Sequence, residues 1–306
     1  MLDRGNFLGN WLILTSMITL KNILAPMDVA AFAAEFWQKK FYLRVGTFEP
    51  YADLMSWQML SSLLEEHRFV PPRIRLYKDG KRIPPDSFQY RHPAFLLKSR
   101  EVLDQISSGA TLIIDSVEQT NPNLRLFAHE VQSCLCAPVN VNLYAACGDT
   151  NGFPVHRDQQ ENFILQIAGE KHWRVWTNEP REANDLGQTP PYWEGTLKEG
   201  DLAYIPKNWW HVATPIGEPS LHLTLSLVPL TFADFFDWLH QQLSFRPELS
   251  RPLLVALDSE ADHQSALEFS SLLKGYCELE RIHEYLSSQP WNQPNYPKVV
   301  FPFLTE

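Results

Sequence analysis

The chain holds three side chains whose types and spacing suit a metal ion. His156 and Asp158 flank a single residue, and His211 ends the phrase Tyr-Ile-Pro-Lys-Asn-Trp-Trp-His. Two imidazoles and one carboxylate are the ligands of the facial triad that holds Fe(II) in oxygenases and leaves coordination positions open. In a strand, residues i and i+2 point to the same side, so His156 and Asp158 can reach one metal while Arg157 faces elsewhere. Zinc accepts the same ligand types and is the main alternative metal.

An alternating run follows the first two ligands. Residues 162–168 read Asn-Phe-Ile-Leu-Gln-Ile-Ala, Gly169-Glu170 interrupts the run, and residues 171–176 resume it. This pattern predicts two strands joined by a short glycine-containing turn. Lys171 opens the second strand, and inside a barrel its ammonium could point toward an anionic co-substrate. Because an uncompensated buried charge is unfavourable, a buried Lys171 has a purpose only beside an anionic ligand, which argues against a zinc hydrolase.

Three more strands are predicted around these residues. Gly200-Asp201 is typical of a turn, and the segment after it is predicted to be a strand that delivers His211 at its end. Residues 139–146 are predicted to form the strand that leads to the metal site. Residues 221–228 alternate leucine with polar residues that share one face. These polar residues are His222, Thr224 and Ser226.

Taken in order, these phrases resemble the JmjC-type cupin oxygenases that use Fe(II) and 2-oxoglutarate, closest to the ribosomal-oxygenase (ribosomal-protein hydroxylase) group. The resemblance begins near Thr19 and covers most of the chain. It implies a mainly β fold with helices: a double-stranded β-helix (jelly-roll or cupin) core, N-terminal α/β elements and a C-terminal helical segment. The phrases that carry it are Asn142-Leu-Tyr144, Gly152-Phe-Pro-Val-His156-Arg-Asp158, Phe163-Ile-Leu-Gln-Ile-x-Gly-x-Lys171-x-Trp173, Gly200-Asp201, and Ile205-Pro206 leading to Trp210-His211.

The resemblance also implies a set of site residues. Its iron ligands, which are also the catalytic residues, are His156, Asp158 and His211. Lys171 is implied to form a salt bridge with the distal carboxylate of 2-oxoglutarate, with O2 as the other co-substrate. The residues implied to assist Lys171 are Tyr144, Asn142 and, where the family often has a small polar residue, Ser226. Phe153-Pro154-Val155 departs from the Gly, Pro or Thr that many relatives carry before the first ligand, so the pocket wall is expected to differ there.

Composition limits the other possibilities. The 306 residues are 44% hydrophobic and 20% charged, which is typical of a globular protein with an ample core. The formal net charge of −10 argues against general nucleic-acid binding through a positive field. Four cysteines, Cys134, Cys136, Cys147 and Cys277, form no CxxC pair and no disulfide framework, which favours a cytoplasmic location. The apolar stretch from Leu8 to Leu20 is too short for a membrane span, and no membrane association is expected.

The organisation is predicted in three parts. Residues 1–18 are an N-terminal extension, residues 19–229 the JmjC/cupin oxygenase domain, and residues 230–306 a C-terminal helical segment. In the C-terminal segment, Phe232, Phe235, Phe236, Leu239 and Leu243 recur at helical spacing. We expect this apolar stripe to build a homodimer, with folding back onto the barrel as the alternative.

Several elements upstream of the metal site are predicted from capping and periodicity. Helices are predicted over Asp28–Lys39, Trp57–Glu66 and Phe95–Ser107, and from Asn121-Pro122 to about Cys134; strands are predicted over Phe41–Val45 and Ala110–Asp115. Residues 179–199 have the composition of a long loop. This loop either lines the substrate entrance with Tyr192 and Trp193, or is packed onto the barrel by Trp193.

Arg73–Ile83 is predicted to be a hairpin, because Asp79-Gly80 suits a tight type I′ turn. It carries a dense basic cluster in an acidic chain: Arg73, Arg75, Lys78, Lys81 and Arg82. The cluster is either a solvated edge that discourages strand pairing or a contact surface for an acidic or RNA-associated partner.

The function predicted from these features is Fe(II)- and 2-oxoglutarate-dependent hydroxylation of a C–H bond, with an amino-acid residue of a protein or peptide as the expected substrate. The same chemistry on a small molecule or a modified tRNA nucleoside, and N-methyl demethylation, are the enzymatic alternatives. A cupin that binds without catalysis is the non-enzymatic alternative, which the complete ligand set and Lys171 disfavour.

Overall fold

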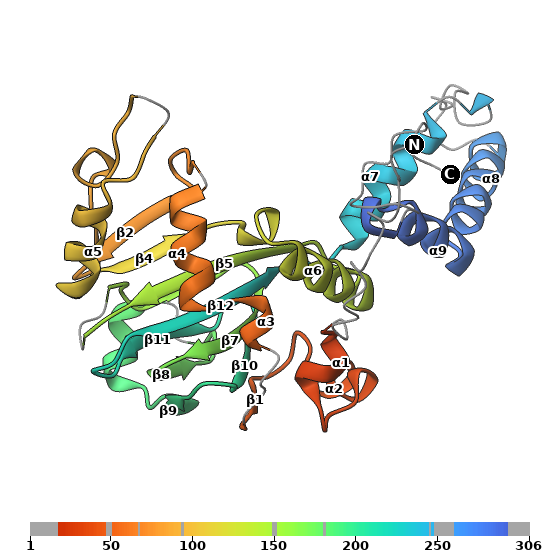
Figure 1. Cartoon of the computed structure of the whole chain (residues 1–306). Coiled ribbons are helices and arrows are strands. Elements are labelled where there is room, and N and C mark those ends of the chain that lie inside the picture. Colours follow the sequence, from red (N-terminus) through yellow and green to blue (C-terminus); the bar gives the residue numbers. More distant parts are fainter. Residues whose placement is uncertain are drawn as a thin grey trace, which may run out of the picture. The chain divides into compact units, whose positions relative to one another are not determined.

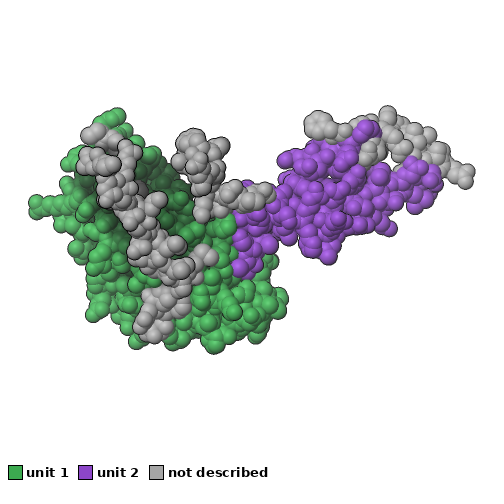
Figure 2. Space-filling model, turned by 45° about the vertical axis from the view of Figure 1, so that its right-hand side comes forward, with its two compact units in different colours: residues 1–131, 139–228 green, residues 132–138, 229–306 purple. Residues whose placement is uncertain are grey.

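The structure of the chain is a computed structural model that describes residues 18–46, 51–66, 68–92, 95–148, 152–179, 182–244, 246–247 and 260–292. The chain divides into two compact units, coloured separately in Figure 2: residues 1–131 with 139–228, and residues 132–138 with 229–306. The predicted N-terminal extension lies outside the described residues apart from Ile18. Among the described helices, none has both the length and the apolar character that a membrane span requires.

Unit 1 is built on two antiparallel sheets (Figure 1). The larger sheet has the strand order β1-β10-β7-β12-β5-β4-β2-β3, and the smaller has the order β6-β11-β8-β9. The strands are β1 (Tyr42–Arg44), β2 (Ile74–Lys78), β3 (Lys81–Arg82), β4 (Thr111–Ile114), β5 (Val139–Ala146), β6 (His156–Arg157), β7 (Glu161–Ala168), β8 (Lys171–Trp176), β9 (Trp193–Leu197), β10 (Leu202–Ile205), β11 (Trp210–Pro215) and β12 (Ser220–Leu227). This arrangement confirms the predicted jelly-roll core.

Helices accompany the sheets of unit 1 and make up unit 2. The α-helices are α1 (Leu20–Leu24), α2 (Val29–Glu35), α3 (Tyr51–Leu54), α4 (Trp57–Glu66), α5 (Ser99–Ser107), α6 (Pro122–Leu135), α7 (Phe232–Leu243), α8 (Glu260–Tyr276) and α9 (Leu279–Ser288). Short 3₁₀ helices are η1 (Pro85–Ser87), η2 (Val117–Gln119), η3 (Ala183–Gln188) and η5 (Pro290–Asn292).

The side-chain alternation of the strands creates two packing faces on the larger sheet. Even-numbered residues of β7, such as Ile164, face the smaller sheet and join an apolar core that both sheets share. The buried members of this core are Phe41, Ile164, Trp173, Val175, Leu197, Ala203, Ile205 and Trp209. Odd-numbered residues such as Phe163 face the opposite side, where the ring of Phe32 from α2 lies 5.4 Å from Phe163 and 5.1 Å from Tyr204.

The predicted helix over Asp28–Lys39 begins as expected and ends early. Asp28 caps α2, since its carboxylate accepts from the N–H groups of Ala30 and Ala31. The helix stops at Glu35 because Gln38 takes a positive φ of 60° and donates its N–H to the Tyr204 hydroxyl at 2.8 Å. The bond to the sheet therefore replaces a last helical turn.

Two strand predictions need correction in their connectivity. Strands β7 and β8 exist as predicted but do not pair with each other, because the chain passes from the larger sheet to the smaller one at Gly169. Gly169 has φ +64°, and a Cβ there would lie 2.2 Å from the Pro219 carbonyl oxygen, so the crossing requires glycine. Likewise His211 does not end the strand after Gly200-Asp201: β10 ends at Ile205, and His211 lies on β11 in the other sheet.

Two further predictions were partly wrong. Residues 179–199, predicted as a loop, contain η3 and strand β9, whose Trp193 packs at 4.8 Å against the ring of Phe41. Of the two alternatives for Trp193, the structure thus supports packing onto the barrel. The helix predicted from Phe95 begins only at Ser99, because Phe95 has a positive φ of 54° and Leu97 forms a β-bridge with Gln89.

Unit 2 contains the predicted helical stripe. Helix α7 starts with a capping box in which Thr231 and Asp234 exchange hydrogen bonds. Its residues Phe235 and Leu239 are buried together with Tyr285 of α9. Phe232 and Phe236 on the same helix are 76% and 52% exposed, so the stripe is buried on one side only.

Candidate metal centre

Strand pairing brings the three predicted metal ligands together. His156 on β6 and His211 on β11 are register partners, and Asp158 follows β6 directly. The Nε2 atom of His156 lies 3.7 Å from Asp158 Oδ1, and that of His211 lies 3.5 Å from Asp158 Oδ2. The three ligand atoms all lie within 4.8 Å of one another. One divalent ion can therefore be held by one atom from each residue.

Backbone carbonyls orient both imidazoles in the same way. Nδ1 of His156 lies 2.9 Å from the Pro154 carbonyl oxygen, and Nδ1 of His211 lies 3.2 Å from that of Trp209. A proton on each Nδ1 satisfies these carbonyls and leaves each Nε2 as a free acceptor, which is the tautomer that a metal needs. Burial, and next the neighbouring His156, lower the pKa of His211 below its usual value. The imidazole of His211 is therefore neutral near pH 7.

The carboxylate of Asp158 is held by a residue to which the sequence analysis gave no role. Asn162 Nδ2 donates to Asp158 Oδ2 at 2.7 Å, and Ser226 Oγ donates to Asn162 Oδ1 at 2.8 Å. Asn162 is 1% exposed. The sequence feature that could have identified Asn162 is its amide side chain at an inward-facing position of a strand that is otherwise largely apolar.

A cavity extends from the metal ligands to Lys171. Its described lining includes Tyr144, Phe153, Trp173, His222 and Thr224 together with the three ligands and Lys171. Lys171 is 3% exposed, and among the described residues no carboxylate lies within ion-pairing distance of its ammonium. Burial lowers the pKa of Lys171 to about 7. The structure thus places in the same cavity as the metal ligands an amine that has no carboxylate partner among the described residues.

Tyr144 and His222 lie together beside Lys171. Their rings stack at 4.7 Å with an interplanar angle of 7°. Burial, and next the nearby Asp158, raise the pKa of Tyr144 above its usual range, so its hydroxyl remains a donor. Burial, Lys171 and His211 lower the pKa of His222, and its buried Nδ1 has no hydrogen-bond partner among the described residues. The sequence analysis did not select His222, although it shares a face with Thr224.

Two predicted co-substrate residues are not among the described residues that line the cavity. Asn142 is not among the described residues that line the cavity, and its Oδ1 accepts from the Ser116 N–H at 3.4 Å. Ser226 is also outside this lining and bonds Asn162 instead. The described lining of the cavity thus contains the three metal ligands, Lys171 and Tyr144, while Asn142 is the register partner of the lining residue Thr224.

The basic hairpin adjoins the segment that precedes His156. Gly80 at its turn donates to the Gly152 carbonyl at 3.3 Å, and Tyr77 contacts Phe153, whose ring lies 4.9 Å from that of His156. Positive φ values at Asp79 and Gly80 confirm the predicted turn.

The hairpin's five cations are not equivalent. The guanidinium of Arg73 donates to the carbonyls of Asp115 and Ser116, and Arg75 forms an ion pair with the Asp115 carboxylate. These two arginines therefore hold β2 against β4, whereas Lys81 and Arg82 are exposed.

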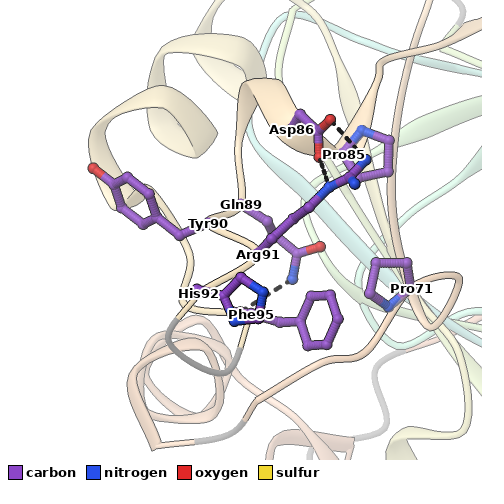
Figure 3. Close-up of a pocket in the computed structure, with 8 residues that line it drawn as sticks. All are labelled: Pro71, Pro85, Asp86, Gln89, Tyr90, Arg91, His92 and Phe95. Atoms are coloured by element: carbon purple, nitrogen blue, oxygen red, sulfur yellow. Dashed lines mark hydrogen bonds and ion pairs between the residues drawn. The ribbon is translucent and has the colours of Figure 1, made fainter.

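A second cavity of about 640 Å³ shares no described lining residue with the first (Figure 3). Pro71, Pro85 and Phe95 form apolar walls, and an exposed ion pair joins Asp86 to Arg91. The buried amide of Gln89 bonds the carbonyls of Phe69 and Phe95, as the dashed line to Phe95 shows in part. This cavity contains none of the predicted site residues.

Comparison with known proteins places this site in a family. The family model described as JmjC domain matches residues 117–235, which include all three metal ligands, Lys171 and Tyr144. The chain carries a JmjC domain of the cupin oxygenases. This confirms the family predicted from the sequence phrases.

Relatives of the JmjC domain are found among sequences and structures. The bifunctional lysine-specific demethylase and histidyl-hydroxylase NO66 of Drosophila persimilis is 32% identical over 222 residues, covering 68% of this chain and 31% of that protein. NO66 of Caenorhabditis elegans is 26% identical over 242 residues, covering 73% of this chain and 31% of that protein. The chain thus spans about a third of the length of these curated relatives.

Solved structures show the same fold. YcfD, a ribosomal oxygenase from Escherichia coli, superposes with a TM-score of 0.53 at 17% identity, covering 85% of this chain and 71% of that chain. YcfD in complex with cobalt and 2-oxoglutarate gives a TM-score of 0.52 at 16% identity. At these identities the likeness to YcfD establishes the fold shared with the JmjC domain.

Proposed function

We propose that this chain is an Fe(II)- and 2-oxoglutarate-dependent oxygenase that hydroxylates a C–H bond in an amino-acid residue of a protein or peptide. The observation that carries the proposal is Lys171, a buried cation without a carboxylate partner among the described residues, in one cavity with the His156, Asp158 and His211 cluster. An anion that pairs with a buried ammonium offsets the cost of removing its charge from water, and a dicarboxylic co-substrate supplies such an anion when it binds at the metal.

The donor set fits the proposed metal and co-substrate. Two neutral imidazoles and one carboxylate suit Fe(II), and a ligand set of three protein atoms leaves positions for other ligands. His156, Asp158 and His211 would hold the metal, and Lys171 with the Tyr144 hydroxyl would bind the distal carboxylate. When bound, Fe(II) and 2-oxoglutarate supply the oxidation, in which one O2 yields succinate, CO2 and a hydroxylated C–H bond.

The protein's own residues have three tasks in this reaction. The backbone carbonyls behind His156 and His211 hold both Nε2 atoms toward one point, which fixes the ligand geometry. Trp173 and Ile164 add apolar surface to the lining of the cavity, and such surface disfavours water around a bound co-substrate. The charge of Lys171 orients the co-substrate along that axis.

A protein or peptide substrate is supported by the relatives and by the entrance. The NO66 proteins are named for action on lysine and histidine residues, and YcfD is named a ribosomal oxygenase. At the entrance, Phe153 and the exposed Lys81 and Arg82 of the adjoining hairpin offer both apolar and cationic contacts. A large partner can use such peripheral charges for orientation.

The assembly and location complete the proposal. We propose a homodimer built by unit 2, because Phe232 and Phe236 are exposed on α7 while Phe269 and Leu273 are exposed on α8. Light scattering that finds a monomer at micromolar concentration would contradict it. A cytoplasmic location is proposed because the spacing of the four cysteines in the sequence forms no CxxC pair and no disulfide framework.

The central test is spectroscopic and needs no known substrate. Adding Fe(II) and 2-oxoglutarate without oxygen should produce the visible metal-to-ligand charge-transfer band, which Asp158→Ala should lose. Admission of O2 should then release succinate. A protein that binds the metal but gives neither the band nor succinate is not an oxygenase of this class. Mass spectrometry of cellular proteins with and without the enzyme should identify substrates by a gain of one oxygen atom.

A further inference from the structure

We infer that Asn162 and Ser226 form a positioning relay that presents one oxygen of Asp158 to the metal; this inference rests on the proposed function. Among the described residues, Asn162 is the one side chain that donates an amide hydrogen bond to the Asp158 carboxylate, at 2.7 Å. The bond goes to Oδ2 alone. Oδ1, which lies 3.7 Å from His156 Nε2, receives no such donor and is left as the oxygen available to a metal.

The strand register builds this relay. Ser226 on β12 and Asn162 on β7 are register partners, so both side chains leave the larger sheet on the same inward face. The Ser226 hydroxyl donates to Asn162 Oδ1 at 2.8 Å, which turns the amide so that Nδ2 points at Asp158. A reversed amide would set its carbonyl oxygen against the carboxylate. The two bonds therefore select one orientation of the amide and, through it, of the carboxylate.

The burial of the relay makes the orientation persistent. Asn162 is 1% exposed, so water cannot readily replace either partner of its amide. Asp158 is about one-third exposed on the opposite side, toward the cavity. One side of the carboxylate is thus anchored in the sheet and the other is open to a ligand. Partners of this kind, which hold a ligand without touching the metal, typically contribute about 10- to 100-fold to metal affinity or activity.

The relay gives Ser226 a role at the metal end, beside the co-substrate role that the family resemblance implies. Its hydroxyl is committed to Asn162, and Ser226 is not among the described residues that line the cavity with Lys171. The relay and the Lys171 end should therefore respond separately to mutation. Loss of the relay should weaken metal binding and leave the affinity for 2-oxoglutarate, once the metal is saturating, unchanged.

The test measures Co(II) binding by calorimetry in the full chain. Asn162→Leu keeps a similar volume but removes both bonds, and it should weaken Co(II) affinity by about 10- to 100-fold. Ser226→Ala should give a smaller loss, and Ser226→Thr, which keeps the hydroxyl, should restore affinity. In a turnover assay, the Fe(II) concentration for half-maximal rate should rise most in Asn162→Leu and less in Ser226→Ala. The KM for 2-oxoglutarate should stay constant in both variants.

A matched control exists on the same two strands. Ser220 of β12 accepts from the Gln166 amide of β7 at 2.9 Å, so a serine and an amide again join the two strands, with the donor and acceptor exchanged and without a link to Asp158. Ser220→Ala should bind Co(II) like the wild type. Unchanged affinity in both Asn162→Leu and Ser226→Ala would overturn the relay, as would an equal loss in Ser220→Ala. Wild type that binds Co(II) but never converts 2-oxoglutarate would overturn the proposed function instead, while the Co(II) comparison still decides the relay.

Discussion

The two ends of the cavity differ in how far the protein itself supplies hydrogen-bond and charge partners for their polar side chains. At the metal end, both imidazoles bond backbone carbonyls and the carboxylate accepts an amide donor. At the other end, Lys171 is buried without a carboxylate partner among the described residues, and a ring nitrogen of His222 is unpaired within the same part of the chain. The metal end is preorganised, whereas the Lys171 end is incomplete without a ligand.

This difference indicates where binding energy is gained. A preorganised ligand set loses little conformational freedom when a metal binds, so its affinity depends on geometry. An unpaired buried cation destabilises the free protein, and an anion that pairs with it removes that penalty. Geometry should therefore dominate the affinity for the metal, and charge should dominate the affinity for the co-substrate at the Lys171 end. Four experiments follow from that contrast.

The largest effect is expected at the metal end. Asp158→Ala removes the one anionic ligand, whose charge also offsets that of Fe(II), so metal binding and succinate release should fall below detection. His156→Ala and His211→Ala should also abolish turnover, because a triad has no spare protein ligand. Calorimetry and a succinate assay check this. Normal iron binding with turnover in Asp158→Ala would mean that the metal lies elsewhere.

The next effect separates the Lys171 end from the metal. Lys171→Met keeps much of the aliphatic stem and removes the charge, so iron should still bind while affinity for 2-oxoglutarate falls by about 2–5 kcal/mol. The ligand-free variant should also unfold at a higher temperature than wild type, because the penalty of the buried charge is gone. Unchanged 2-oxoglutarate affinity would transfer the carboxylate-binding role from Lys171 to Tyr144.

The third effect is a pH dependence at the same end. Free Lys171 has a pKa lowered from 10.5 to about 7, whereas pairing with a carboxylate requires the protonated form. Affinity for 2-oxoglutarate should therefore fall as pH rises above 7, by at most about tenfold per unit. Conversely, the unfolded chain holds this proton up to about 10.5, so ligand-free stability should rise with pH across that window. Both slopes should flatten in Lys171→Met.

The smallest effect concerns the entrance. Replacing Lys81 and Arg82 together by Ser should weaken oxidation of a protein substrate by about 0.2–1 kcal/mol per charge and reduce its salt dependence. Substrate-free conversion of 2-oxoglutarate should persist. The control replaces two exposed cations on helices of unit 1, Lys21 and Arg100, and should change neither activity. Equal substrate oxidation in the hairpin variant and wild type would exclude these charges from substrate binding.

Much of this contrast follows from sequence pattern. The i, i+2 spacing of His156 and Asp158 and the alternation around Lys171 predict inward-facing side chains, and the structure places these residues in one cavity. Strand β5 and helix α4 have their predicted bounds, because alternation and capping are local properties.

What could not be predicted depends on contacts between distant segments. Strands β7 and β8 follow one another in sequence, yet they lie in different sheets because Gly169 permits a close approach to Pro219. The family resemblance implied a co-substrate role for Ser226, whereas its hydrogen bond to Asn162 depends on the β7–β12 register. Arg73 and Arg75 were grouped with the exposed cations, whereas β4 supplies their partners at Asp115.

The pairing of His156 with His211 has a consequence for the stability of the smaller sheet. These two residues come from segments far apart in sequence and face each other only after β6 and β11 have joined. A metal that needs both imidazoles binds the joined state selectively, and so stabilises it by RT ln(1 + [L]/Kd). Metal binding should therefore slow hydrogen exchange of the β11 backbone amides. The ion would then stabilise the smaller sheet in addition to serving catalysis.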